Sequence, residues 1–283
     1  VGVIFIVSFF VVFFWSAFEQ AGASLTFFAD EQTDRTLGWS IPVWTIYAAS
    51  ATLLFFIFRL YHRAKNNLSE NDVLLRNVVY FLLLLMTAGI LYMDYSFLST
   101  INSSLLFEEV PASFFQSLNS TYVVLFAPVF AWLWIKLGKH EPSSPTKMAI
   151  GLLLLSLGYL WISVGVNNIE PGMKVTMIWL AGLYMLHTWG ELCLSPIGLS
   201  LVNKLAPLKL ASLLMAVWFL ANAFANKLAG QLSALYPENK TTSFLGYEMH
   251  NMYDFFMLFV VLSGLASLIL FLLTKWLQKM MNS

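Results

Sequence analysis

Residues 173–202, MKVTMIWLAGLYMLHTWGELCLSPIGLSLV, place one carboxylate and one proline inside an apolar run that is long enough to cross a bilayer. A carboxylate at the centre of a membrane helix costs about 2.5–3.5 kcal/mol to insert, so we expect Glu191 to face a wet cavity or a partner charge. Pro196 lies five positions further on. A broken helix is tolerated in a membrane where its backbone is buried in protein or lines water. The two features together indicate a transport path.

The composition is that of a membrane protein. The chain is 59% hydrophobic and 16% aromatic, and only 11% of its residues are charged. Soluble domains carry about 25% charged residues, so we predict an all-α polytopic membrane protein whose surroundings are a lipid bilayer. The formal net charge is zero, which excludes nucleic-acid binding through a basic surface. The single cysteine, Cys193, cannot form an internal disulfide.

The first residues, VGVIFIVSFFVVFFW, start inside a hydrophobic helix and lack an initiator Met. They also lack the charged segment and the small-residue cleavage site of a secretory signal. We therefore expect the chain to be part of a longer polypeptide.

Eight stretches are long enough to cross the membrane. A hydrocarbon core of about 30 Å needs roughly 20 apolar residues per helix. The predicted spans are residues 1–28, 41–61, 76–98, 113–136, 147–167, 174–203, 209–235 and 252–276.

The connections between the spans alternate in their content of basic residues. The Lys/Arg-rich ones are RLYHRAKNN (59–67), KLGKHEPSSPTK, NKLAPLK and the C-terminal tail KWLQKMMNS. The connections ADEQTDR, FEEVPAS, NNIEPG and YPENKTTSFLGYE carry fewer basic residues, with Arg35 and Lys240 as exceptions. Because basic loops stay on the cytoplasmic side, the first set and the C-terminus are predicted to be cytoplasmic.

Small residues predict how the spans bend and pack. Gly22 loosens the first span, and Pro128 falls in the fourth. Ala221, Ala225 and Ala229 recur every four residues in the seventh span, a pattern that lets helices approach closely.

Polar side chains share faces of the first and fourth spans. Trp15 and Glu19 are four residues apart, with Gln20 alongside, and Gln116 and Asn119 are three apart; such pairs lie on one helix face. Glu19 either sits in the outer interface or faces the protein interior, and the apolar run that follows it favours the interior. The amide pair either joins helices or lines a site.

The sixth span carries a polar stripe of Tyr184, His187, Glu191 and Ser195, spaced three or four residues apart. The zinc pattern H-E-x-x-H needs a second histidine, which is missing here, so no metal site is predicted.

Trp218 and Asn222 share a face of the seventh span. This tryptophan either lines a site or packs between helices, the more frequent role of a membrane tryptophan.

Four segments resemble the proton-dependent oligopeptide transporter family of the major facilitator superfamily. They are FWSAFEQAGASLTFFADEQTDR (14–35), PASFFQSLNSTYVVLFAPVFAWLW (111–134), GELCLSPIGLSLVNKLAP (190–207) and MAVWFLANAFANKLAG (215–230). Against that family, the chain looks like the C-terminal six-helix half of the fold.

One feature departs from the family pattern. The two extra spans, 41–61 and 76–98, separate the first segment from the second. We interpret them as a hairpin packed outside the bundle. The expected organisation is residues 1–40 as the first helix of the bundle with its outer loop, 41–98 as the inserted hairpin, and 99–283 as the remaining five helices.

The resemblance implies a role for each matching residue in binding a peptide. Glu191 would meet the amino terminus of the peptide, with Ser195 one turn away, and Asn119 would hydrogen-bond the same end. Trp15 and Trp218 would line side-chain pockets.

The resemblance also implies how a proton would be coupled. Glu19 would pair across an outer gate with an arginine of the missing N-terminal half, and Glu191 would exchange a basic partner for the ammonium group of the peptide. Burial disfavours the charged form of a carboxylate and a nearby cation favours it, so protonating Glu19 would weaken the gate. The proton is the coupling ion, and no cofactor is expected. The cationic groups for the substrate carboxylate, and the E-x-x-E-R motif, would belong to the missing half.

The predicted function is symport of di- and tripeptides with protons by alternating access, with this chain forming the C-terminal wall of the cavity in a plasma membrane. Two alternatives stay open. One is a transporter of another small solute, such as nitrate, another anion or a glycoside. The other is a non-transporting membrane protein that senses peptides or acts as a scaffold. An intramembrane hydrolase would need a facing Ser–His or Asp–Asp pair, whose spacing is missing, so no enzyme is predicted.

Overall fold

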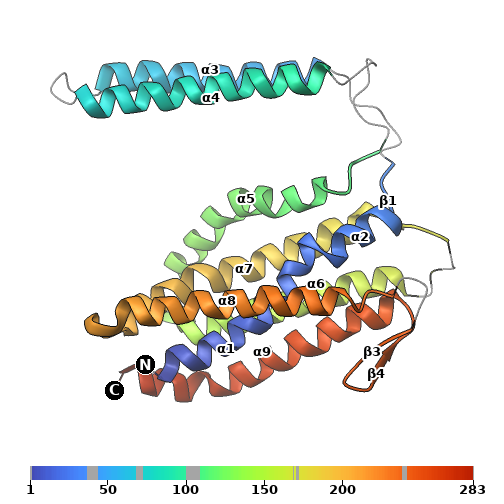
Figure 1. The fold of residues 1–283 in the computed structure, drawn as a ribbon. Helices are drawn as coiled ribbons and strands as arrows, with labels where there is room; N and C mark the ends of the chain where they lie inside the picture. Colours follow the sequence, from blue (N-terminus) through green and yellow to red (C-terminus); the bar gives the residue numbers. More distant parts are fainter. Residues whose placement is uncertain are drawn as a thin grey trace. The chain divides into compact units, whose positions relative to one another are not determined.

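The computed structural model describes residues 2–36, 44–67, 73–99, 109–167, 169, 172–237 and 241–282, most of them in helices (Figure 1). The chain divides into two compact units. The first comprises residues 1–35 and 111–283, and the second comprises residues 36–110.

The first unit contains six spans and two small β pairs. Its elements are α1 (Gly2–Phe18), a 3-10 turn (Glu19–Gly22), α2 (Ser24–Glu31), β1 (Thr33–Asp34), α5 (Phe114–Leu137), α6 (Ser144–Val166), β2 (Val175–Thr176), α7 (Met177–Leu205), α8 (Ala211–Ser233), β3 (Thr242–Phe244), β4 (Tyr247–Met249) and α9 (Met252–Asn282). Short 3-10 turns precede α6 and α8, at Gly138–His140 and Leu208–Leu210.

Long helices occupy all eight predicted ranges, with the first span broken into α1 and α2. Within the part of the chain that the structure describes, seven of them are long and apolar enough to cross a membrane. The eighth, α7, has 29 residues and carries the polar stripe. The predicted start of the second span, at residue 41, lies outside the described residues.

Two predictions are wrong, one about where a helix ends and one about a break inside a helix. Residues 59–67 do not form a loop, because α3 of the second unit runs from Trp44 to Asn67. This segment lacks Gly and Pro, and its Arg, Lys and Ala residues are good helix formers. The expected break at Pro196 is also absent, since α7 continues through that proline to Leu205. A proline removes one backbone donor, and the remaining hydrogen bonds can keep a membrane helix continuous.

The first span is broken where Gly22 predicted it to loosen. The helix tightens into the 3-10 turn after Phe18, and Ala23 adopts φ −131° and ψ −104°, outside the helical region. α2 then starts at Ser24 as a separate helix.

The core of the first unit lies around α6. This helix packs along both α7 and α9, while α1 packs on α8 and α9 and α5 contacts α7. The three small residues of α8, Ala221, Ala225 and Ala229, are buried, in line with their predicted role in close helix contact. Figure 1 shows the start of α1 and the end of α9 at the same end of the bundle, where the Cβ position of Gly2 lies 3.5 Å from Cε of Met280.

The backbones of α6 and α7 meet at two glycines. A Cβ atom on Gly190 would lie 2.7 Å from the carbonyl oxygen of Gly151, and one on Gly151 would lie 2.8 Å from that of Gly190. Because both neighbours are backbone atoms, neither can move aside as a side chain could. This contact sets the position of α7 immediately before Glu191.

We expect Gly190→Ala to lower the thermal stability of the protein. Overpacking of this kind costs about 1–3 kcal/mol, and each kcal/mol shifts the melting temperature by roughly 2–4 °C in a chain of this size. The measurement is thermal unfolding of the purified protein in detergent. Gly230→Ala is the matched control, because no atom lies within 4 Å of its Cβ position. A variant at position 190 as stable as the control would show that the backbone contact is not tight.

Candidate functional site

Side chains from several helices donate hydrogen bonds to backbone carbonyl groups at the break in the first span. The hydroxyl of Tyr159, on α6, donates to the carbonyl oxygen of Ala17 at 2.6 Å. The hydroxyls of Tyr184, on α7, and Thr26, on α2, both donate to the carbonyl oxygen of Ala21, at 3.3 and 2.9 Å. Backbone groups in a membrane must be satisfied within the protein, so these bonds stabilise the break.

Gln20 holds the same break against α8. Its side chain is fully buried, with 0% exposure. Its amide nitrogen donates to the carbonyl oxygens of Ser16 at 3.1 Å and Ala229 at 2.9 Å, and its amide oxygen accepts from the Ser24 hydroxyl at 2.6 Å. The sequence shows Gln20 beside Glu19 but does not predict that its side chain joins the break to α8. Its bonds fix the backbone next to Glu19.

Glu191 is half-buried and hydrogen-bonded to a neighbouring helix. The amide nitrogen of Asn119, on α5, donates to Glu191 Oε2 at 2.9 Å and to the Thr188 hydroxyl at 3.1 Å. The Thr188 hydroxyl in turn donates to the carbonyl oxygen of Tyr184 at 2.7 Å. Thr188 was not among the predicted site residues, although its spacing of three residues from Glu191 places both on the same face of α7.

Two carboxylates approach each other beside the break. Glu19 opens the 3-10 turn and is close enough to Glu191 for the two charges to interact unfavourably. Both side chains are neither fully buried nor fully exposed. A proton on one carboxylate, or a cation between the two, would relieve this repulsion.

A cavity of about 760 Å³ lies between α1, α7 and α8. Its wall combines aromatic rings, amides, hydroxyls and one lysine. The residues that line it are Trp15, Ser195, Pro196, Leu199, Ser200, Asn203, Lys204, Trp218, Phe219 and Asn222.

Trp218, in this wall, packs closely against a glycine of α7. Its side chain is only 3% exposed, and its ring lies so close to α7 that a Cβ atom on Gly198 would be 2.2 Å from Cη2. The indole therefore both packs on α7 and lines the cavity.

The structure brings the predicted site residues into two neighbouring groups. Trp15, Ser195 and Trp218 line the cavity, whereas Asn119 and Glu191 are bonded to each other. Glu191 is not among the cavity-lining residues, although it lies one helical turn from Ser195.

Gln116 is separate from both groups. Its amide nitrogen donates to the Thr26 hydroxyl at 2.9 Å and so joins α5 to α2. Of the two alternatives for the amide pair, Gln116 fits the interhelical contact, and Asn119 belongs to the group around Glu191.

Asn203, at the end of the predicted span, and Lys204, assigned by the sequence to the basic loop, both line the cavity. They belong to the last turns of α7, because the helix continues past Pro196. Among the described residues, no group of three or more His, Cys, Asp or Glu could hold a metal ion.

Comparisons with known proteins converge on one family. The sequence profile of the POT family matches residues 73–249. The chain is 42% identical over 143 residues to the uncharacterized transporter YclF of Bacillus subtilis, and 40% identical over 126 residues to the peptide transporter YePEPT of Yersinia enterocolitica. It is 32% identical over 169 residues to the di-/tripeptide transporter of Lactococcus lactis. These alignments cover 49%, 43% and 59% of this chain.

Solved structures have the same fold. A crystal structure of a mutant peptide transporter POT in complex with alafosfalin superposes with a TM-score of 0.66 at 26% identity, over 99% of this chain and 41% of that chain. Another crystal structure of a mutant of this transporter superposes with a TM-score of 0.61 at 27% identity, over 97% of this chain and 38% of that chain. Both superpositions and the family profile extend into the second unit.

The chain spans much less than the whole length of these proteins. The three alignments cover 28%, 25% and 32% of the relatives' own sequences.

We expect Gln20→Leu to destabilise the first unit, because it leaves the buried Ser24 hydroxyl without its acceptor and removes the link to α8. Leaving a buried polar group unpaired costs about 1–3 kcal/mol, which corresponds to a melting temperature lower by roughly 2–12 °C. Gln116→Leu is the control, since it removes an amide that is exposed. Equal shifts for both variants in detergent would argue against a special role for the break.

Proposed function

This chain belongs to the POT family, and we propose that it forms the C-terminal wall of the substrate cavity in a proton-coupled transporter of di- and tripeptides. The proposed mechanism is alternating access, in which two six-helix bundles rock about a site near the middle of the membrane. The N-terminal bundle, the partner of this wall, would be supplied by residues outside this sequence.

The observation that carries the proposal is the carboxylate of Glu191, held by the amide of Asn119 one turn from the cavity. A carboxylate at this depth in a membrane protein usually marks a pathway for substrate or ions. Its negative charge suits the ammonium group at the amino terminus of a peptide. The Ser195 hydroxyl offers a further hydrogen-bonding group on the same helix.

The aromatic part of the cavity suits peptide side chains. Trp15 and Trp218 lie on different helices and line the same space. Aromatic rings accept apolar groups of different shapes by contact alone. We infer that these rings bind side chains, while the polar groups around Glu191 bind the constant peptide backbone.

Proton coupling is proposed to use the two carboxylates beside the break. Glu19 and Glu191 are close enough for their charges to interact, so a change of charge on one would be felt by the other. The arrival of the peptide ammonium would then neutralise Glu191 and change which group holds the proton. The proton is the coupling ion of this scheme.

The family consists of multi-pass membrane transporters. We propose the plasma membrane as the location, with the C-terminus in the cytoplasm as the distribution of basic residues predicts. Two of the named relatives are peptide transporters, which favours peptides over nitrate, other anions or glycosides as the substrate. Their names also point to transport rather than to catalysis or to sensing alone.

We expect Glu191→Gln to abolish proton-driven accumulation of a labelled dipeptide by the full-length protein in sealed proteoliposomes. The amide cannot release a proton. A hydrogen bond to a charged group contributes about 1.5–3 kcal/mol, so the affinity for peptide should fall roughly tenfold to hundredfold.

The matched control is Glu248→Gln, on the exposed β4 strand. It should accumulate peptide like the wild type when an inward proton gradient is imposed. Wild-type accumulation by the Glu191 variant would refute its role. Binding without accumulation by the wild type would indicate a sensor instead of a transporter.

A further inference from the structure

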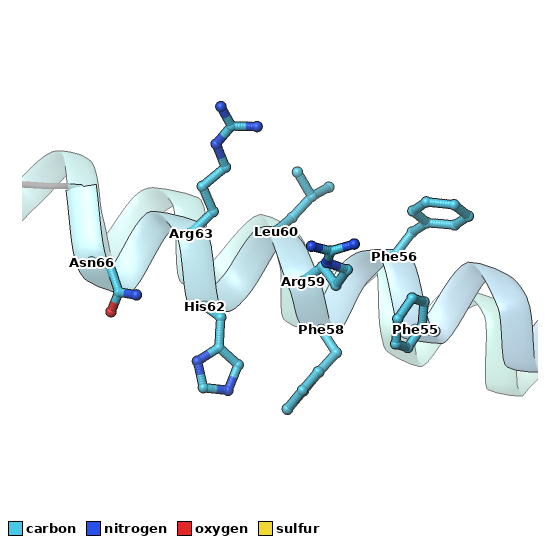
Figure 2. A pocket seen from close by; sticks show the side chains of 8 residues that line it. All are labelled: Phe55, Phe56, Phe58, Arg59, Leu60, His62, Arg63 and Asn66. Atoms are coloured by element: carbon cyan, nitrogen blue, oxygen red, sulfur yellow. The ribbon is translucent and has the colours of Figure 1, made fainter.

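The second unit is a helical hairpin whose first helix, α3, has two distinct faces. Its partner is α4 (Val73–Ser99). The face of α3 that contacts α4 carries Ile57, which is only 8% exposed, and Tyr61, whose ring centroid lies 4.9 Å from that of Tyr80. A hollow of about 810 Å³ lies along the other face (Figure 2). The residues that line it are Phe55, Phe56, Phe58, Arg59, Leu60, His62, Arg63 and Asn66.

This second face changes from aromatic to cationic along the helix axis. Phe55, Arg59 and Arg63 follow each other at intervals of four residues, which places them on one side of α3. The guanidinium carbon of Arg59 lies 6.0 Å from the centre of the Phe55 ring. Figure 2 shows the two arginines following the phenylalanines along the helix, with Asn66 beyond them. The face is therefore apolar on one side of Arg59 and polar on the other.

Among the described residues of the hairpin, no acidic residue lies at this end. In the described part of the second unit the acidic residues are Asp94 and Glu109. Asp94 accepts a hydrogen bond of 2.8 Å from Ser50, toward the start of α3. Residues 59–76 contain four Arg and Lys residues and two acidic ones, Glu70 and Asp72, and both acids fall outside the described residues. The arginine end keeps a net positive charge.

We propose that this face binds an anionic phospholipid, with its phosphate between Arg59 and Arg63 and an acyl chain along Phe55 and Phe56. A guanidinium group matches the geometry of a phosphate and can donate two parallel hydrogen bonds to it. Basic residues next to a membrane span attract anionic lipids by about 1 kcal/mol each. The phenylalanine rings precede the arginines along α3, on the side away from its basic end, where an acyl chain would lie.

The topology rule for basic residues explains why cations gather at one end of a hairpin. It does not require that they share a face with aromatic rings, away from the partner helix. The arrangement on one face is what points to a lipid. The inference depends on the hairpin crossing a membrane and is independent of the proposed transport of peptides.

The test compares two charge-removing double variants of the full-length protein. Arg59→Gln with Arg63→Gln removes both cations from the face. Lys65→Gln with Arg76→Gln removes two charges from the same end of the hairpin, but Lys65 lies off this face by helical geometry and Arg76 belongs to α4. Native mass spectrometry of the detergent-solubilised protein measures bound phosphatidylglycerol and phosphatidylcholine. Thermal unfolding with each lipid confirms that the variants are folded.

We expect the wild type to retain phosphatidylglycerol in preference to phosphatidylcholine. The arginine double variant should lose roughly fivefold in affinity for phosphatidylglycerol for each arginine, about 25-fold in all. Its weak binding of phosphatidylcholine should be unchanged. The control double variant should stay close to the wild type.

Three outcomes would overturn the proposal. Equal retention of the two lipids would mean that the headgroup charge is not recognised. Equal losses in both double variants would mean that overall charge, and not this face, attracts the lipid. Displacement of the lipid by inorganic phosphate, with the same gain in thermal stability, would indicate a site for free anions.

Discussion

The structure depends on the requirement that backbone polar groups inside a membrane find partners within the protein. At the break around residues 19–22, other helices supply some of these partners. Tyr159 and Tyr184 donate to carbonyl oxygens of the broken span, and Gln20 joins it to α8. These bonds come from α6, α7 and the first span itself. The break is therefore a point where hydrogen bonds connect the first span to α6, α7 and α8.

The same break positions the candidate site. Glu19 opens the 3-10 turn and Trp15 lies one turn before it, so both side chains are set by the end of α1. On the opposite side, the glycine contact between α6 and α7 fixes the backbone immediately before Glu191. Two rigid elements therefore bring the carboxylates close together, and Asn119 binds Glu191 from a third helix. Because packing restricts the backbone around both carboxylates, they stay close together. Binding of a proton or a cation then changes the interaction between their charges.

The two units present different surfaces. In the first, polar side chains point into the bundle and bind backbone or line the cavity. In the second, two helices contact each other along one side, and most of their large apolar side chains are exposed. Exposed apolar rings next to arginines suit a boundary between acyl chains and headgroups. The first unit uses its polar groups to form a site, and the hairpin presents its basic end to its surroundings.

The helices and many of the candidate residues could be predicted from the sequence, because hydrophobic length and polar spacing are local properties. The spans, the loosened helix at Gly22 and the small face of α8 follow from such patterns. The tertiary structure was needed wherever the answer depends on a partner far away in the chain. It showed that Gln20 reaches Ala229, that Asn119 binds Glu191 directly, and that the end of α7 lines the cavity. Local spacing gives the face of a helix on which a side chain lies, and only the packing of helices gives the group that it meets.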